Sequence, residues 1–195
     1  MSSRIVLFVP SSKALSNENI AAAVIAELIR HWSEGPRDAD ERAVEAVEAR
    51  KATETHPRLF ATSYHESGHA VVSLALGYPP RQVHVIPDHT SWGTTRNSRI
   101  VDPLADIAAT LGGPMSEALA TGLQPQLPNA KDGDLFHIAK AARRAADPGA
   151  VVSQGIKLAS AMLVLHWPAV RRVARRLMDQ GRLYQTEIMR EVCDA

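Results

Sequence analysis

The chain has 195 residues, of which 45% are hydrophobic and 22% are charged, so it can bury a core and is not expected to be disordered. It contains 22 lysine and arginine residues against 21 aspartate and glutamate residues, a balance that gives no indication of a nucleic-acid partner or an anionic membrane surface. Its single cysteine, Cys193, excludes a disulfide framework and makes a cysteine-based zinc site unexpected.

Residues 1–56 are predicted to form an N-terminal extension that contains a short strand and two helices. The strand is residues 5–9, and the first helix is residues 16–32, before the stop at Gly35-Pro36. The second helix starts at Asp38, with Glu41 at capping-box spacing. The longest nearly apolar stretch, IAAAVIAELI, is about half a membrane thickness, so we expect a cytoplasmic protein without a membrane span.

The stretch TSYHESGHAVVSLALG, residues 62–77, predicts a buried helix that ends at Gly77. It contains His65, Glu66 and His69 in the order H-E-x-x-H. Residues four apart lie on nearly the same face of a helix, so both imidazoles can reach one ion. Zinc suits two imidazoles plus an oxygen ligand, with a fourth position for water. Glu66 could take a proton from the zinc-bound water and pass it to the leaving amine.

A chance match on an ordinary helix is the alternative interpretation of this motif. Ser63 and Glu66 have capping-box spacing, so Glu66 could simply mark the start of a helix. Against this, a glycine inside a helix costs about 1 kcal/mol relative to alanine, so Gly68 suggests the close approach of another backbone or a ligand. Two histidines and a glutamate in a buried helix also need partners.

Beyond this helix, the sequence predicts two short strands and then further helices. Residues 81–87 form the first predicted strand, and residues 92–101 contain the second. The first predicted helix follows Asp102-Pro103 and has a break at Gly112-Gly113. The second starts at Asp134 and stops near Asp147. The rest of the chain, residues 151–192, is predicted to be helical, with breaks at residues 166–168 and near Gly181.

A zinc site of this kind needs a third protein ligand. The candidates are Glu117, Asp132, Asp134, His84, His89 and His137. A carboxylate at the start of a helix has a defined position and direction, which favours Asp134. The alternative is that Asp134 is simply the N-cap of its helix.

Five blocks of this sequence together resemble a known family. They are SYHESGHAVVSLAL, PPRQVHVIP, WGTT, LGGPMSEALATG and DLFHIAKAARRAA, and in this order they resemble the peptidase domain of the FtsH family of ATP-dependent zinc metalloproteases. The resemblance implies a domain at residues 57–195 with a mainly α (α+β) fold, in which a small β-sheet lies beside the H-E-x-x-H helix. The family carries transmembrane segments and an ATPase module before the peptidase, and we expect neither in this sequence.

The resemblance also implies roles for individual residues. His65 and His69 would bind zinc, with Glu66 as the catalytic base. Asp134 would be the third ligand, because it opens the block DLFHIAKAAR in step with the family pattern D-(I/L)-x-x-A-T-x-x-A-R, although Ile-Ala replaces Ala-Thr. Zinc is therefore the expected cofactor.

Two of the five blocks also imply residues around this centre. The block GGPMSE places Glu117 near the site, as a partner that orients a ligand. The block SWGTT implies that Trp92, Gly93 and Thr94 pair with an extended substrate.

We therefore expect a zinc-dependent endopeptidase that cleaves unfolded or flexible protein segments. The alternative is a non-proteolytic or partner-dependent protein-binding or regulatory module that retains the FtsH peptidase fold. The intact H-E-x-x-H favours the peptidase, because a docking module has no need of Glu66. The resemblance implies either a homo-oligomer, which would be a hexamer, or a separate ATPase partner. No nucleic-acid partner is expected.

Overall fold

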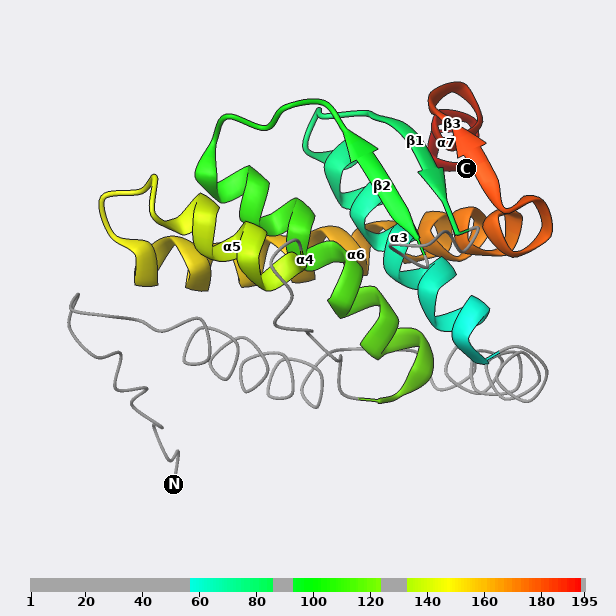
Figure 1. Ribbon diagram of the computed structural model, residues 1–195, viewed down its shortest axis with the longest axis horizontal. Coiled ribbons are helices and arrows are strands. Elements are labelled where there is room, and N and C mark those ends of the chain that lie inside the picture. The colour runs from blue at the N-terminus through cyan, green and yellow to red at the C-terminus, as the bar shows by residue number, and fades with distance from the viewer. Residues whose placement is uncertain (1–56, 86–92, 124–132, 194–195) are drawn as a thin grey trace.

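The computed structural model describes residues 57–85, 93–123 and 133–193, which are mainly helical with a small antiparallel sheet (Figure 1). The helices are α3 (Pro57–Ala75), α4 (Pro103–Thr121), α5 (Asp134–Ala142), α6 (Pro148–Gln180) and α7 (Gln185–Cys193). The strands are β1 (Pro80–His84), β2 (Thr94–Asn97) and β3 (Arg182–Tyr184). The predicted mainly α (α+β) fold is confirmed, and the predicted extension at residues 1–56 lies outside the described residues.

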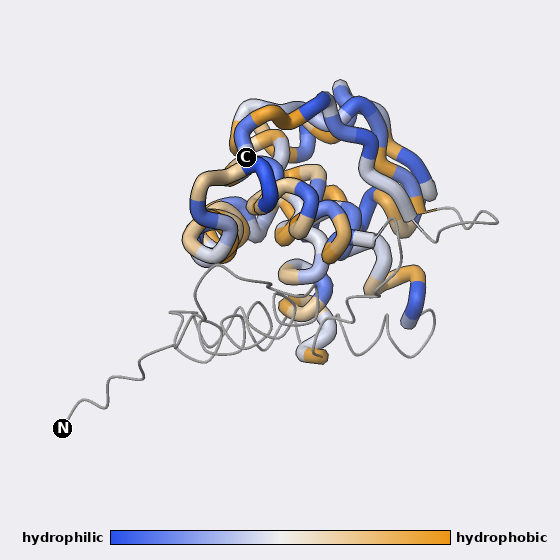
Figure 2. The backbone as a smooth tube through the Cα atoms, turned by 60° about the vertical axis from the view of Figure 1, so that its left-hand side comes forward, coloured by the Kyte–Doolittle hydropathy of each residue, from blue (hydrophilic) through white to orange (hydrophobic). Residues whose placement is uncertain are grey.

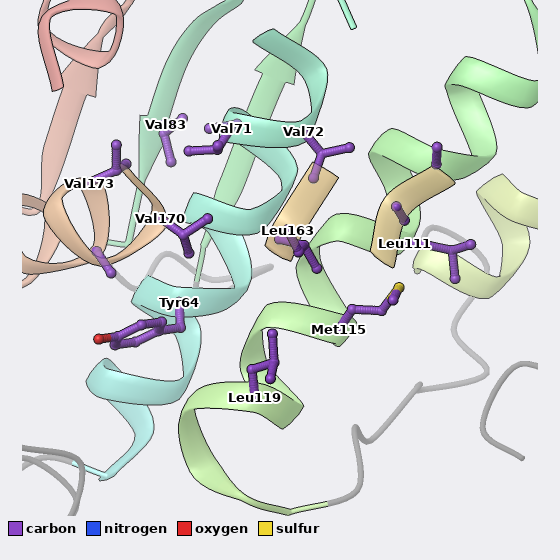
Figure 3. Packing of buried hydrophobic residues seen from close by; sticks show 14 of the residues in the cluster. Tyr64, Val71, Val72, Val83, Leu111, Met115, Leu119, Leu163, Val170 and Val173 are labelled. Carbon is purple, nitrogen blue, oxygen red and sulfur yellow. The ribbon is translucent and has the colours of Figure 1, made fainter. Parts of the chain in front are cut away.

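The core lies between α3, α4 and α6. Figure 2 shows hydrophobic and hydrophilic residues alternating over short distances along the helices, as in helices that bury one face. Figure 3 shows the side chains that gather from the buried faces: Tyr64, Val71 and Val72 from α3, Leu111, Met115 and Leu119 from α4, Leu163, Val170 and Val173 from α6, and Val83 from β1. Each large apolar side chain buried in this way stabilises the fold by about 1.5–3 kcal/mol.

The helix that carries the H-E-x-x-H motif, α3, begins before the predicted segment 62–77. It begins at Pro57, whose fixed φ suits the first turn of a helix, and the chain leaves it at Gly77, which has a φ of 85°. The predicted end at Gly77 is therefore confirmed. Ser63 and Glu66 lie well inside the helix, so the alternative in which Glu66 belongs to a capping box at the helix start is wrong.

The next helix, α4, runs without interruption through Gly112, Gly113 and Pro114, so the predicted break at Gly112-Gly113 is wrong. Asp102 caps its start by accepting hydrogen bonds from two backbone N–H groups of the first turn. Both glycines are buried, and their missing side chains allow α3 to approach closely. Tertiary packing therefore outweighs the low helix propensity of the glycine pair, about 1 kcal/mol per residue.

The longest helix, α6, is kinked where His166 leaves helical geometry (φ −110°, ψ 17°), two residues before Pro168. The predicted break at residues 166–168 is therefore confirmed. The kink arises because a proline has no N–H to donate to the preceding turn. The helix begins at Pro148, earlier than predicted. It ends as predicted at Gly181, which has a φ of 71°.

Among the described helices, α6 is also the one that is long and apolar enough to cross a membrane, by length and composition alone. Helices that form one wall of a protein core share this composition. Leu163, Val170 and Val173 of α6 are buried in the core that it shares with α3 and α4. The expected absence of a membrane span remains a prediction.

The sheet has the strand order β2-β1-β3, with both outer strands antiparallel to β1. Thr95, Val83 and Leu183 lie opposite one another across the three strands, and Val83 and Leu183 are completely buried. Thr95 therefore faces the helices as well, because side chains along a strand alternate between the two faces. The outer edge of β2 has no strand partner within the described residues. The strand β3 falls in a segment that was predicted as helical, and its three residues are too few to show alternation.

Candidate metal centre

His65 and His69 lie one turn apart on α3 and turn their rings toward the same point. Their Nε2 atoms are 3.1 Å apart. Asp134, the first residue of α5, places one carboxylate oxygen 3.0 Å from Nε2 of His65 and the other 3.4 Å from Nε2 of His69. Donor atoms of the three side chains all lie within 4.8 Å of one another, so together they could hold a metal ion.

The remaining ring nitrogens of the two histidines are held from behind. Nδ1 of His65 lies 2.8 Å from a carboxylate oxygen of Glu117, and Nδ1 of His69 lies 3.0 Å from the main-chain oxygen of Ala109. A carbonyl oxygen can only accept, so Nδ1 of His69 donates and its Nε2 keeps a free lone pair in the neutral ring. This arrangement orients imidazoles in metal sites, and it makes the three side chains a good fit for zinc.

The electrostatics of the three side chains also favour a cation. Burial lowers the pKa of His65, but hydrogen bonds to Asp134 and Glu117 outweigh it and raise the pKa to about 10. The pKa of His69 is also raised, because the charge and hydrogen bond of Asp134 outweigh burial. Burial acts to raise the pKa of Asp134, yet His69 and His65 hold it well below its usual range. The cluster therefore favours added positive charge, which protons supply in the metal-free protein and a divalent cation would supply in their place.

Glycines bring the helices close enough to build this cluster. A Cβ at Gly113 of α4 would lie 2.2 Å from Nε2 of His69, so the imidazole occupies the space that a side chain would fill. A Cβ at Gly68 of α3 would lie 2.0 Å from the main-chain oxygen of Gly112. The close approach that the sequence predicted at Gly68 is therefore confirmed, and α4 is the neighbouring backbone.

Asp134 reaches the histidines because of how α5 begins. The N-cap of α5 is Gly133, with no side-chain capping bond, so the alternative in which Asp134 is only the N-cap is wrong. The carboxylate lies at the positive end of the helix dipole, which stabilises its charge. The residues that anchor α5 share one buried face, and they are Leu135, Ile138, Ala139, Ala141 and Ala142.

Glu66 lies beside the first histidine and is buried, with 7% of its surface exposed. Thr95 of β2 places its hydroxyl 2.7 Å from the carboxylate oxygen Oε2 of Glu66. Sequence reasoning missed Thr95, because the contact depends on how β2 pairs and packs. The only available signal was its position two residues after Gly93.

Among the other residues singled out from the sequence, Gly93 lies against Glu66, because a Cβ at position 93 would be 2.7 Å from Oε1 of that carboxylate. The rest lie apart from the three candidate ligands or outside the described residues. Gly93 directly precedes β2 and Thr94 opens it, whereas Trp92 lies outside the described residues. His84 is buried on β1 and His137 is exposed on α5, and neither belongs to the group that could hold a metal. Asp132 and His89, the other ligand candidates, also lie outside the described residues.

Comparison of the chain with models of known protein families finds no match, and no curated protein matches it. The fold and the site therefore define the class of protein: a mainly helical protein with a two-histidine, one-carboxylate candidate metal centre.

Proposed function

We propose that the protein is a zinc-dependent endopeptidase of the FtsH type, in which His65, His69 and Asp134 hold zinc and Glu66 is the general base. The observation that carries the proposal is the convergence of these three side chains, with the buried Glu66 next to His65. Two imidazoles and a carboxylate leave one position of a tetrahedral site open. An open position is typical of catalytic rather than structural zinc.

The chain's own residues divide the chemistry among them. Zinc, when bound, supplies a Lewis acid that lowers the pKa of a water molecule and polarises the carbonyl group of the substrate. Glu66 accepts a proton from the water and later gives it to the amine of the departing product. Glu117 and the main-chain oxygen of Ala109 hold the imidazoles with Nε2 toward the centre. These two contacts support the proposal, because they orient both ligands before any metal binds.

The outer edge of β2, which has no strand partner among the residues that the structure describes, supports an extended segment as the substrate. A peptide that lies along Thr94–Asn97 would exchange main-chain hydrogen bonds with the strand and become a further strand of the sheet. The main chain of a folded domain is already paired within that domain. The proposed substrates are therefore unfolded proteins, peptides or flexible tails.

The experiment combines metal analysis of the purified chain with casein cleavage. We compare the wild type with Glu66→Gln, which removes the base, and Asp134→Ala, which removes a ligand. Asp179→Ala changes an exposed aspartate at the end of α6 and is the matched control. We expect about one zinc ion per chain in the wild type, Glu66→Gln and the control, and loss of zinc in Asp134→Ala. Cleavage is expected only in the wild type and the control.

Two results would contradict the proposal. Zinc binding without cleavage of casein would favour the docking or regulatory module, which keeps the fold and the metal. Absence of bound metal after reconstitution with zinc would remove the basis of the proposed chemistry.

A further inference from the structure

The Glu66 carboxylate lies against β2 at both of its oxygen atoms. Thr95 Oγ1 is 2.7 Å from Oε2, and a Cβ at Gly93 would lie 2.7 Å from Oε1. Gly93 and Thr95 are two residues apart, so they face the same side of the strand. The carboxylate therefore packs directly on the backbone at the start of β2, and position 93 has no room for a side chain.

Thr95 also links the strand to the backbone of the motif helix. Its hydroxyl lies 3.0 Å from the main-chain oxygen of Glu66, in addition to its shorter contact with the carboxylate. A threonine hydroxyl has one hydrogen, so the shorter contact is the one to which it donates. Thr95 therefore donates a hydrogen bond to a buried carboxylate. Loss of the hydroxyl would leave the charge without that partner.

The proposed substrate would lie along the outer edge of β2, which faces away from β1. β2 has four residues and, in the part of the chain that the structure describes, one strand neighbour, β1. A strand with a single neighbour has weaker support than one held on both edges. A peptide added to the open edge would give β2 a second neighbour, and it would thereby fix Gly93 and Thr95 more firmly against Glu66.

We propose that Thr95 is a positioning residue that couples peptide binding on β2 to the alignment of Glu66. The inference rests on the proposed peptidase function. Interaction energy gained along the strand then acts in the catalytic step, because an occupied strand holds Thr95 more firmly against the carboxylate that it already contacts. Longer extended peptides should therefore be turned over faster, in addition to being bound more tightly.

The test compares Thr95→Val, Thr95→Ser and Thr186→Val in the full-length, zinc-loaded protein. Thr186 is an exposed threonine on α7, and its change to valine is the matched control. We measure kcat and KM for a short and a long version of one casein-derived peptide. The wild type and the control should have a higher kcat for the long peptide. Thr95→Val should lose this advantage, with kcat for the long peptide reduced about 10- to 100-fold, and Thr95→Ser should retain it.

A second measurement does not depend on activity. Glutamate labelled with ¹³C at the side-chain carboxyl gives an NMR signal for Glu66, which is assigned by its absence in Glu66→Gln. Thr95→Val should shift this signal, whereas Thr95→Ser and Thr186→Val should leave it in place. Zinc content and thermal unfolding are measured for every variant.

Two outcomes would overturn the inference. The first is a Thr95→Val protein with an unchanged Glu66 signal and an unchanged length dependence of kcat. The second is an equal loss of kcat for both peptides that Thr95→Ser does not restore, which would mark a purely structural role. If the wild type cleaves no peptide, the proposed peptidase function fails, and the Glu66 signal by itself decides whether Thr95 holds the carboxylate.

Discussion

Gly68 of α3 lies directly against the main-chain oxygen of Gly112 of α4: a Cβ at position 68 would lie 2.0 Å from that oxygen. The contact is reciprocal, because a Cβ at position 112 would lie 2.6 Å from the main-chain oxygen of Gly68. Ser116 reinforces the crossing by donating to the main-chain oxygen of Tyr64. This close approach brings His69 within reach of α4, which holds its Nδ1 and leaves room for its ring.

Replacement of Gly68 by alanine should therefore destabilise the protein by about 3 kcal/mol, because the new methyl group would meet backbone atoms that cannot turn aside. Gly77→Ala is the comparison. Gly77 has a positive φ and nothing within 4 Å of a built Cβ, so its cost should be the backbone strain alone, about 1–2 kcal/mol. Urea unfolding of both variants measures the difference. Equal costs at the two positions would contradict the packing explanation.

Gly113→Ala tests the space beside the candidate metal centre. The added Cβ would lie 2.2 Å from Nε2 of His69, so the imidazole must move, and we expect zinc affinity to fall by about tenfold or more. Competition with a coloured chelator measures the affinity. In a His69→Ala background the same substitution should cost less stability, because the ring that it meets is absent. A cost of the same size in both backgrounds would show that the ring is not the obstacle.

Two substitutions at Glu117 separate its hydrogen bond from its charge. Glu117→Ala removes the acceptor 2.8 Å from Nδ1 of His65 and should weaken zinc binding about 10- to 100-fold. Glu117→Gln keeps an acceptor oxygen and should lose less. Chelator competition ranks the two variants against the wild type. A loss in Glu117→Gln as large as in Glu117→Ala would assign the whole effect to the negative charge.

Metal-free protein should have a stability maximum on the acid side of neutrality. Burial lowers the pKa of His65, but Asp134 and Glu117 raise it overall to about 10, so its contribution is complete below about pH 6.5 and is lost as the pH rises toward 10. The depressed pKa of Asp134 adds stability that is present above about pH 4 and is lost in acid. Thermal unfolding in the presence of a chelator should therefore give the highest Tm between about pH 4 and 6.5. A Tm that rises from pH 7 to 9 would contradict the assignment.

Bound zinc should prevent the loss of stability that the metal-free protein shows at alkaline pH. The ion and the proton compete for Nε2 of His65 and His69, so zinc affinity should increase with pH between about pH 6 and 8. Calorimetric titration in buffers with different ionisation enthalpies counts the protons released on binding. Release of at least one proton at pH 7 is expected, and release of none would show that both imidazoles are already neutral in the metal-free protein.

The parts of the fold that were predicted correctly are those with local signals. The motif helix shows its apolar periodicity, Gly77 marks its end, and Pro168 marks the kink in α6. The break predicted at Gly112-Gly113 was wrong for a physical reason: propensity describes a helix alone, whereas these glycines are required by the crossing with α3.

The site residues also separate into those with a local sequence signal and those without one. His65, Glu66 and His69 share one helical turn, and their spacing can be seen in the sequence. Asp134 came from the start of a predicted helix and from a family resemblance, because nothing local shows which helix packs beside α3. Thr95 could not be found at all without the register of β2 against β1, which turns its side chain toward Glu66.

Asp134 and His69 are distant in the chain and adjacent in space, and the segment between them contains β1, β2 and α4. An ion shared by the two residues would close that segment into a loop, as a disulfide does, and would restrict the unfolded chain. Unlike a disulfide, this cross-link opens when the metal is removed. The concentration of zinc would then determine the fraction of folded protein as well as the number of active sites. Removal of zinc by a chelator would weaken the attachment of α5 to α3 in addition to stopping catalysis.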